Sequence, residues 1–134
     1  MEFVFLAIED PSLRDQVRAG LRMFPNLRPV NLPQDLLPIA LRSEPMSGAI
    51  ILDGDRSRGD LASRMEVVRE LQPDLLLLVV GPRGQRERMH RSKLELEIFS
   101  HIPTPLEAFD LARRLNRLSL AFQSSDAGAQ RSAG

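Results

Sequence analysis

Residues 75–80, LLLLVV, form an uninterrupted apolar run that is as long as any in the chain. A short run of aliphatic side chains, bounded here by Asp74 and Gly81, is typical of a strand that is buried on both faces of a sheet. The run is far shorter than the roughly 20 residues that a membrane-spanning helix needs. We therefore predict a central strand at this point and no membrane segment.

Four further segments have the character of strands. Residues 3–8 (FVFLAI) and 49–52 (AIIL) are continuous apolar runs, whereas residues 27–32 are a weaker candidate whose proline suggests an edge position. Residues 98–102 are the fifth candidate. Strands that alternate with helices predict an α/β fold, a five-stranded doubly wound parallel sheet with helices on both faces. In such sheets the functional crevice lies at the carboxyl ends of the strands.

The segments between and after these strands have helical patterns of apolar residues. The predicted helices cover residues 12–24, 33–41, 61–71, 85–97 and 106–122. Residues 123–134 are mostly Ser, Ala, Gly and Gln, and they have few apolar side chains that a core could bury. We therefore predict one folded domain over residues 1–122 and a flexible tail or linker over residues 123–134.

Composition excludes several classes of function. The chain has 18 basic and 18 acidic residues, so its zero net charge argues against a nucleic-acid binder or a polybasic membrane binder. It has no cysteine, which excludes disulfides and thiolate metal sites. Lys93 is the only lysine, so a mechanism that needs an ammonium group has one candidate. The expectation is a cytoplasmic protein without a nucleic-acid or membrane partner.

Acidic residues follow two of the predicted strands. Glu9 and Asp10 come after residues 3–8, and Asp53 and Asp55 come after residues 49–52. In a parallel sheet these ends face the same edge, where carboxylates could hold Mg²⁺ and Asp53 could accept a phosphoryl group. The alternative is that the acids are solvated loop residues that cap the next helices. Spacing alone leaves both interpretations open.

The order of these segments resembles the receiver domain of bacterial two-component response regulators. The resemblance covers residues 1–122 and is carried by FLAIEDPSLR at residues 5–14, AIILD at 49–53, the strand before Gly81, and IPTP at 102–105. It implies that Asp53 occupies the phosphoacceptor position. It also implies that Glu9 and Asp10 stand where the family binds Mg²⁺.

The sequence departs from the receiver pattern at the positions that handle the phosphoryl group. Thr104 stands where the family has a lysine, and Gly81 stands where it has a Thr or Ser hydroxyl. His101 occupies the aromatic switch position. Removal of one charge donor from such a site costs roughly 2.7–4 kcal/mol of barrier, by analogy with oxyanion-hole deletions. The departures predict a pseudo-receiver that is not an enzyme, requires no cofactor and binds Mg²⁺ weakly at Glu9, Asp10 and Asp53.

The resemblance also implies where a partner binds. Receivers use the face formed by the fourth helix, fifth strand and fifth helix, where this chain offers Met89, Leu94, Phe99 and His101 as anchors. The alternative is that Leu94 and Phe99 belong to the core. The main hypothesis is a signalling module that binds a protein partner or itself independently of aspartyl phosphorylation, as the N-terminal regulatory or localisation domain of a larger protein. The other hypotheses are a phosphorylatable receiver that uses Asp53 with Mg²⁺ and a small flavodoxin-like ligand-binding protein.

Overall fold

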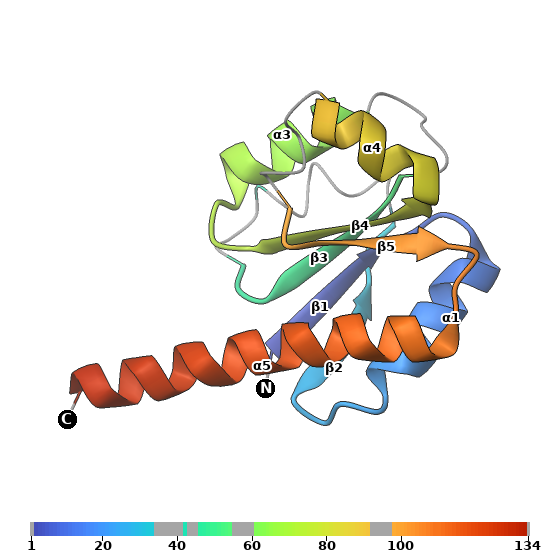
Figure 1. The fold of residues 1–134 in the computed structure, drawn as a ribbon. Helices are drawn as coiled ribbons and strands as arrows, with labels where there is room; N and C mark the ends of the chain where they lie inside the picture. The colour runs from blue at the N-terminus through green and yellow to red at the C-terminus, as the bar shows by residue number, and fades with distance from the viewer. Residues whose placement is uncertain (1, 34–41, 43–45, 55–60, 92–97, 134) are drawn as a thin grey trace.

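The five predicted strands form one parallel sheet in the order β2-β1-β3-β4-β5 (Figure 1). The computed structural model describes residues 2–33, 42, 46–54, 61–91 and 98–133, with only the backbone for Arg86 and residues 125–133. The strands are β1 (Glu2–Ala7), β2 (Leu27–Asn31), β3 (Ala49–Asp53), β4 (Leu76–Pro82) and β5 (Ser100–Thr104). The weak strand with its proline, β2, lies at an edge as predicted, because an edge strand tolerates the missing N–H group.

Helices cover both faces of the sheet. The described helices are α1 (Pro11–Leu21), α3 (Leu61–Leu71), α4 (Arg83–Arg91) and α5 (Ala108–Ala133). Figure 1 shows α1 and α5 on one face and α3 and α4 on the other. This arrangement confirms the predicted doubly wound fold. Of the helix predicted over residues 33–41, all but Pro33 lies outside the described residues.

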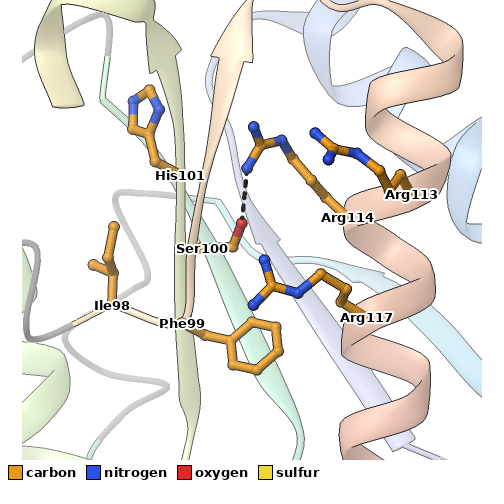
Figure 2. A pocket seen from close by; sticks show the side chains of 7 residues that line it. All are labelled: Ile98, Phe99, Ser100, His101, Arg113, Arg114 and Arg117. Atoms are coloured by element: carbon orange, nitrogen blue, oxygen red, sulfur yellow. Dashed lines mark hydrogen bonds between the residues drawn. The ribbon is translucent and has the colours of Figure 1, made fainter.

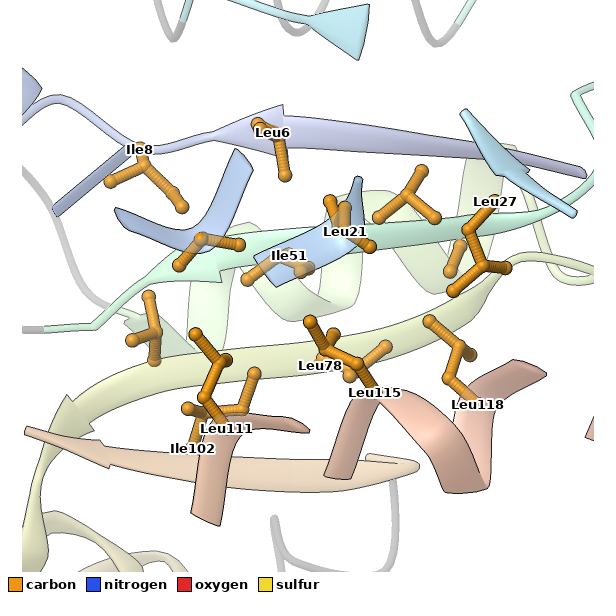
Figure 3. Close-up of a cluster of buried hydrophobic side chains, with 14 of the residues drawn as sticks. Leu6, Ile8, Leu21, Leu27, Ile51, Leu78, Ile102, Leu111, Leu115 and Leu118 are labelled. Carbon is orange, nitrogen blue, oxygen red and sulfur yellow. The ribbon is translucent and has the colours of Figure 1, made fainter. Parts of the chain in front are cut away.

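Each face of the sheet has its own apolar core because side chains alternate along the strands. Leu6, Ile51 and Leu78 point toward α1 and α5, where Leu21 and Leu115 meet them (Figure 3). The neighbouring strand residues, which include Ile50, Leu52, Leu77 and Val79, pack with the buried residues of α3 and α4. Burial on both faces explains why the strands read as continuous apolar runs.

Asp10 starts α1. Its Oδ1 accepts hydrogen bonds from the backbone N–H of Ser12 at 2.9 Å and of Leu13 at 3.4 Å, and Pro11 occupies the first turn. These bonds satisfy backbone donors that have no partner inside the helix, and proline loses nothing there. For Asp10 the capping interpretation is therefore confirmed.

The last helix, α5, continues to Ala133 and projects past the sheet (Figure 1). Elongation of a formed helix is far easier than nucleation, and no proline interrupts residues 123–133. The division into a domain over residues 1–122 and a flexible tail or linker over residues 123–134 stays a prediction. No helix in the described part of the chain is long and apolar enough to cross a membrane.

Candidate functional site

The strand register brings the predicted site positions to one edge of the sheet. Ala7 pairs with Leu52, so the residues after β1 lie beside the end of β3. Asp53 pairs with Val80, and Gly81 with Pro103. The carboxyl ends of β1, β3, β4 and β5 therefore meet at a common edge, as the sequence predicts.

Asp53 is the last residue of β3, and only 1% of its surface is exposed. It lies between β1 and β4 in the middle of the sheet. The alternative interpretation of this residue as a solvated loop acid is therefore wrong. Its burial follows from the sheet order, which places a strand on each side of β3.

The other acids have different environments. Asp10 is exposed and caps α1, whereas Glu9 is half-buried. Asp55 lies outside the described residues. Within the described ranges, no group of three or more His, Asp or Glu side chains could hold a metal ion. The Mg²⁺ site at Glu9, Asp10 and Asp53 stays a prediction.

The buried side chain of Gln85 connects three elements at this edge. Its Nε2 donates a hydrogen bond to the carbonyl oxygen of Gly54 at 2.7 Å, and its Oε1 lies 3.2 Å from His101 Nε2. Gly54 N–H in turn donates to the Val80 carbonyl at 2.8 Å. We call these contacts of Gln85 with Gly54 and His101 the Gln85 bridge. It joins α4 to β5 and to the residue after β3.

The geometry of the Gln85 bridge fixes its proton positions. The Gly54 carbonyl only accepts, so the amide nitrogen of Gln85 must face it and the amide oxygen must face His101. That oxygen also only accepts, so His101 carries a proton on Nε2. A Cβ atom at Gly54 would lie 2.5 Å from Gln85 Oε1, so the carboxamide packs directly on this glycine. No local pattern in the sequence points to Gln85, because its partners lie 31 and 16 residues away.

The departures from the receiver pattern are located at the same edge. Gly81 is buried within β4 and offers no hydroxyl, and Thr104 ends β5 with an uncharged side chain. The Thr104–Pro105 peptide bond is cis. Lys93, the only lysine in the sequence, lies outside the described residues.

The predicted partner anchors are mostly not at the surface. Met89 is 3% exposed and packs in the core beneath α4, so its prediction as a surface anchor is wrong; its apolar side chain faces the sheet because the rest of α4 is charged or polar. His101 is 4% exposed. Phe99 is half-buried and packs against the core, as the alternative interpretation holds. Leu94 lies outside the described residues.

The outer face of α5 presents a different set of side chains. Phe109 is 78% and Leu120 50% exposed, with Arg113 and Arg117 exposed between them. The spacings of four, four and three residues place these side chains along one side of the helix. We call these four residues the α5 stripe. The buried positions Leu111, Leu115, Leu118 and Phe122 form the opposite side.

Arginines also line a pocket between β5 and α5 (Figure 2). The pocket has a volume of about 320 Å³ and is lined by Ile98, Phe99, Ser100, His101, Arg113, Arg114 and Arg117. A smaller hollow of about 210 Å³ shares His101 and Arg114 with it and adds Arg83 and Pro103. Hydrogen bonds from Arg113 and Arg114 hold the pKa of Asp110 below its ordinary value of 3.8. We call the larger hollow the arginine pocket.

The chain is similar to known proteins in its three-dimensional structure but not in its sequence. No protein-family model and no curated protein sequence matches this chain. The receiver domain of AraT, a response regulator from Geobacillus stearothermophilus, superposes with a TM-score of 0.73 at 17% identity, over 93% of this chain and 98% of that one. The chain has the receiver fold.

Two further structures illustrate the range of proteins with this receiver fold. The chemotaxis response regulator CheY4 of Vibrio cholerae has a TM-score of 0.69 at 16% identity, covering 88% of this chain and 98% of that one. A putative pilus assembly protein from Burkholderia thailandensis has a TM-score of 0.67 at 17% identity, covering 89% and 98%. At these identities the likeness extends to the fold alone.

Proposed function

We propose that this receiver fold is a pseudo-receiver, a non-catalytic signalling module that binds a protein partner independently of aspartyl phosphorylation. The observation that carries the proposal is the burial of Asp53, which is 1% exposed. A phosphodonor must approach the attacking carboxylate oxygen in line, and Mg²⁺ must reach the same oxygen region. A carboxylate enclosed between neighbouring strands is poorly placed for either approach.

The positions around Asp53 support the same conclusion. Phosphoryl transfer depends on positioning and on neutralisation of the phosphoryl charge. Thr104 supplies no charge, and Gly81 supplies no hydroxyl to follow the phosphoryl group. The Gln85 bridge already satisfies His101 and the Gly54 carbonyl. A phosphoryl group on Asp53 would therefore make nearly the same contacts in any two conformations of the domain. A group that does not bind one conformation more tightly than the other cannot shift their populations.

The α5 stripe is the partner surface in this proposal. Large exposed apolar side chains beside arginines are a composition enriched in protein interfaces. The charge of Arg113 and Arg117 fits an acidic partner. A symmetric dimer through this stripe would bring the same arginines near one another, which disfavours self-association. We therefore infer an acidic protein partner, with Phe109 and Leu120 as the apolar contacts.

A phosphorylatable receiver is the second candidate. The position of Asp53 at the end of β3, beside the end of β1 with Glu9 and Asp10, favours it. Incubation with Mg²⁺ and acetyl phosphate, or with a beryllium fluoride mimic, separates the candidates. Amide chemical shifts from NMR are a suitable readout, because the chain has no Trp or Tyr for fluorescence. We expect no saturable change; a saturable change that Asp53→Ala abolishes would overturn the proposal.

A reconstruction variant provides the matched positive control. Gly81→Thr combined with Thr104→Lys returns the hydroxyl and the cation that the receiver pattern uses. If these losses are what disables the site, the double variant gains a response to beryllium fluoride that the parent chain lacks. A parent chain that already responds as strongly as the double variant contradicts the proposal.

Partner binding can be tested separately in the cells that produce the protein. A photocrosslinking amino acid at Phe109 should give a discrete adduct, whereas one at Met23, which is 69% exposed in the segment between α1 and β2, should give none. The Asp53→Ala variant should give the same adduct in the same yield. Loss of the adduct in that variant would show that partner binding requires the aspartate.

A further inference from the structure

We propose that the arginine pocket binds a small phosphate-bearing ligand. The pocket lies at the edge strand β5, beside α5, and not at the carboxyl edge where Asp53 lies (Figure 2). The inference does not depend on whether Asp53 is phosphorylated, although Arg113 and Arg117 belong to both the arginine pocket and the α5 stripe. Four steps support it: convergence of the arginines, local charge, fixed geometry and size.

Arginines from two elements converge on this region. Arg113, Arg114 and Arg117 lie within two turns of α5, and Figure 2 shows their guanidinium groups on the side of the helix that faces β5. Arg83, at the start of α4, lines the adjoining hollow together with Arg114. Convergence on one hollow differs from the even spread of basic residues that a solvated helix face shows.

The charges of the described residues that line the pocket do not balance. No carboxylate is among the described residues that line either hollow. Asp110 accepts hydrogen bonds from Arg113 at 2.7 Å and from Arg114 at 2.9 Å, so one negative charge faces three positive charges on α5. Like charges at helical spacing repel one another. A ligand with two negative charges, such as a phosphate monoester, would remove this excess.

Two of the guanidinium groups, those of Arg114 and Arg117, have partners in the protein before any ligand binds. The Arg114 side chain is only 16% exposed, and its Nη1 donates to Ser100 Oγ at 3.4 Å while its Nε donates to Asp110. The Arg117 guanidinium lies 6.0 Å from the centroid of the Phe99 ring. Fixed side chains lose less entropy on binding, and the planar guanidinium matches phosphate oxygens with two parallel hydrogen bonds.

The size and lining of the pocket favour a small molecule. Its volume of about 320 Å³ lies at the lower end of the range of roughly 300–1,000 Å³ for small-molecule sites. Phe99 gives the pocket an apolar wall beside the Arg117 guanidinium, whereas Ile98 packs with the core on the other face of the sheet (Figure 2). An aromatic ring system can rest on such a surface. The expected ligand class is therefore a phosphate monoester or diphosphate with a flat ring, of nucleotide size.

Calorimetric titration tests the inference. The probes are inorganic phosphate, pyrophosphate and ADP, in a buffer without Mg²⁺ so that the acidic edge does not contribute. ADP and pyrophosphate should bind saturably with one molecule per chain, and added NaCl should weaken them. Arg117→Gln and Arg114→Gln should each weaken binding by roughly tenfold or more, as expected for lost hydrogen bonds to a charged group. Arg114→Lys keeps the charge but loses the planar donor set and should also weaken binding.

Three controls make the result decisive. Arg28→Gln removes an exposed arginine from β2, at the opposite edge of the sheet, and should leave binding unchanged. Asp53→Ala and Phe109→Ala should also leave it unchanged, although Phe109→Ala removes the partner contact of the proposed function. The inference is overturned if no probe binds saturably, or if Arg28→Gln and Arg117→Gln lose the same amount of affinity. It is also overturned if an aspartate-rich peptide binds more tightly than both ADP and pyrophosphate.

Discussion

His101 and Gln85 share a buried hydrogen bond, with His101 Nε2 3.2 Å from Gln85 Oε1. The two residues lie on β5 and α4, and the other end of the same amide is hydrogen-bonded to Gly54. The contact therefore fixes the start of α4 against β5 and against the residue that follows β3.

We predict that Gln85→Ala lowers the free energy of unfolding by about 1–3 kcal/mol. The variant removes one hydrogen bond from the half-buried Gly54 carbonyl and one from the buried His101 Nε2, and the loss of such a partner carries a cost of that size. Urea unfolding followed by circular dichroism measures the change. Gln16→Ala is the matched control, because Gln16 is exposed and its side chain donates to the hydroxyl of the exposed Ser12 at 3.3 Å. Equal effects of the two substitutions would show that the Gln85 bridge contributes nothing specific.

The strands were predictable from sequence because burial on both faces leaves no polar alternation in them. Residues 75–80 illustrate this, since Leu77 and Leu78 point into opposite cores and both are fully buried. Pro29 likewise indicates an edge strand, because proline has no backbone N–H to donate to a second neighbouring strand. The carboxyl edge with Asp53 followed from the parallel topology alone. In each case the signal is local in the sequence.

The predictions that failed depend on long-range packing. The Gln85 bridge needs the positions of Gly54 and His101, which no local pattern contains. Met89 is buried because α4 presents that side to the sheet, and a short helix with few apolar residues leaves its orientation open in the sequence. In α5 the regular spacing of Leu111, Leu115, Leu118 and Phe122 marks the buried side, and Phe109 lies outside it.

Asp110 should contribute a pH-dependent part of the stability. Its hydrogen bonds with Arg113 and Arg114 lower its folded-state pKa below 3.8, so the folded protein gains stability when Asp110 is ionised in both states. That gain is fully present above pH 3.8 and is lost as the pH falls through the lower, folded-state pKa. We expect wild type to exceed Asp110→Asn by up to about 1 kcal/mol near neutral pH, typical of two helix-surface ion pairs.

The measurement is chemical unfolding of both proteins from neutral pH to about pH 2 in low salt. The difference between them should shrink only below pH 3.8, and it should also shrink in high salt because these side chains are near the surface. A difference that stays constant across the acid range would mean that Asp110 acts through packing and not through its charge.

Truncation of a side chain to alanine should change the free energy of unfolding far more on the buried side of α5 than on its exposed side. Leu115 is fully buried, so Leu115→Ala should lower the free energy of unfolding by about 2–5 kcal/mol through lost burial and cavity formation. Phe109 is 78% exposed, so Phe109→Ala should change stability by no more than about 0.5 kcal/mol. Thermal and urea unfolding measure both. A large loss of stability in Phe109→Ala would place this residue in the core and remove it from the proposed partner surface.

Gly48 and Gly84 should differ in their tolerance of a methyl group. Gly48 has φ 113°, which side chains rarely adopt, and an added Cβ would collide with the Phe3 carbonyl oxygen as the chain enters β3. Gly48→Ala should therefore cost about 2 kcal/mol or more. An added Cβ at Gly84, in α4, meets nothing within 4 Å, so Gly84→Ala should leave stability unchanged or raise it by up to about 1 kcal/mol. Urea unfolding of both variants decides the matter: equal stability would mean that the β1–β3 pairing does not require the close approach of Gly48 to Phe3.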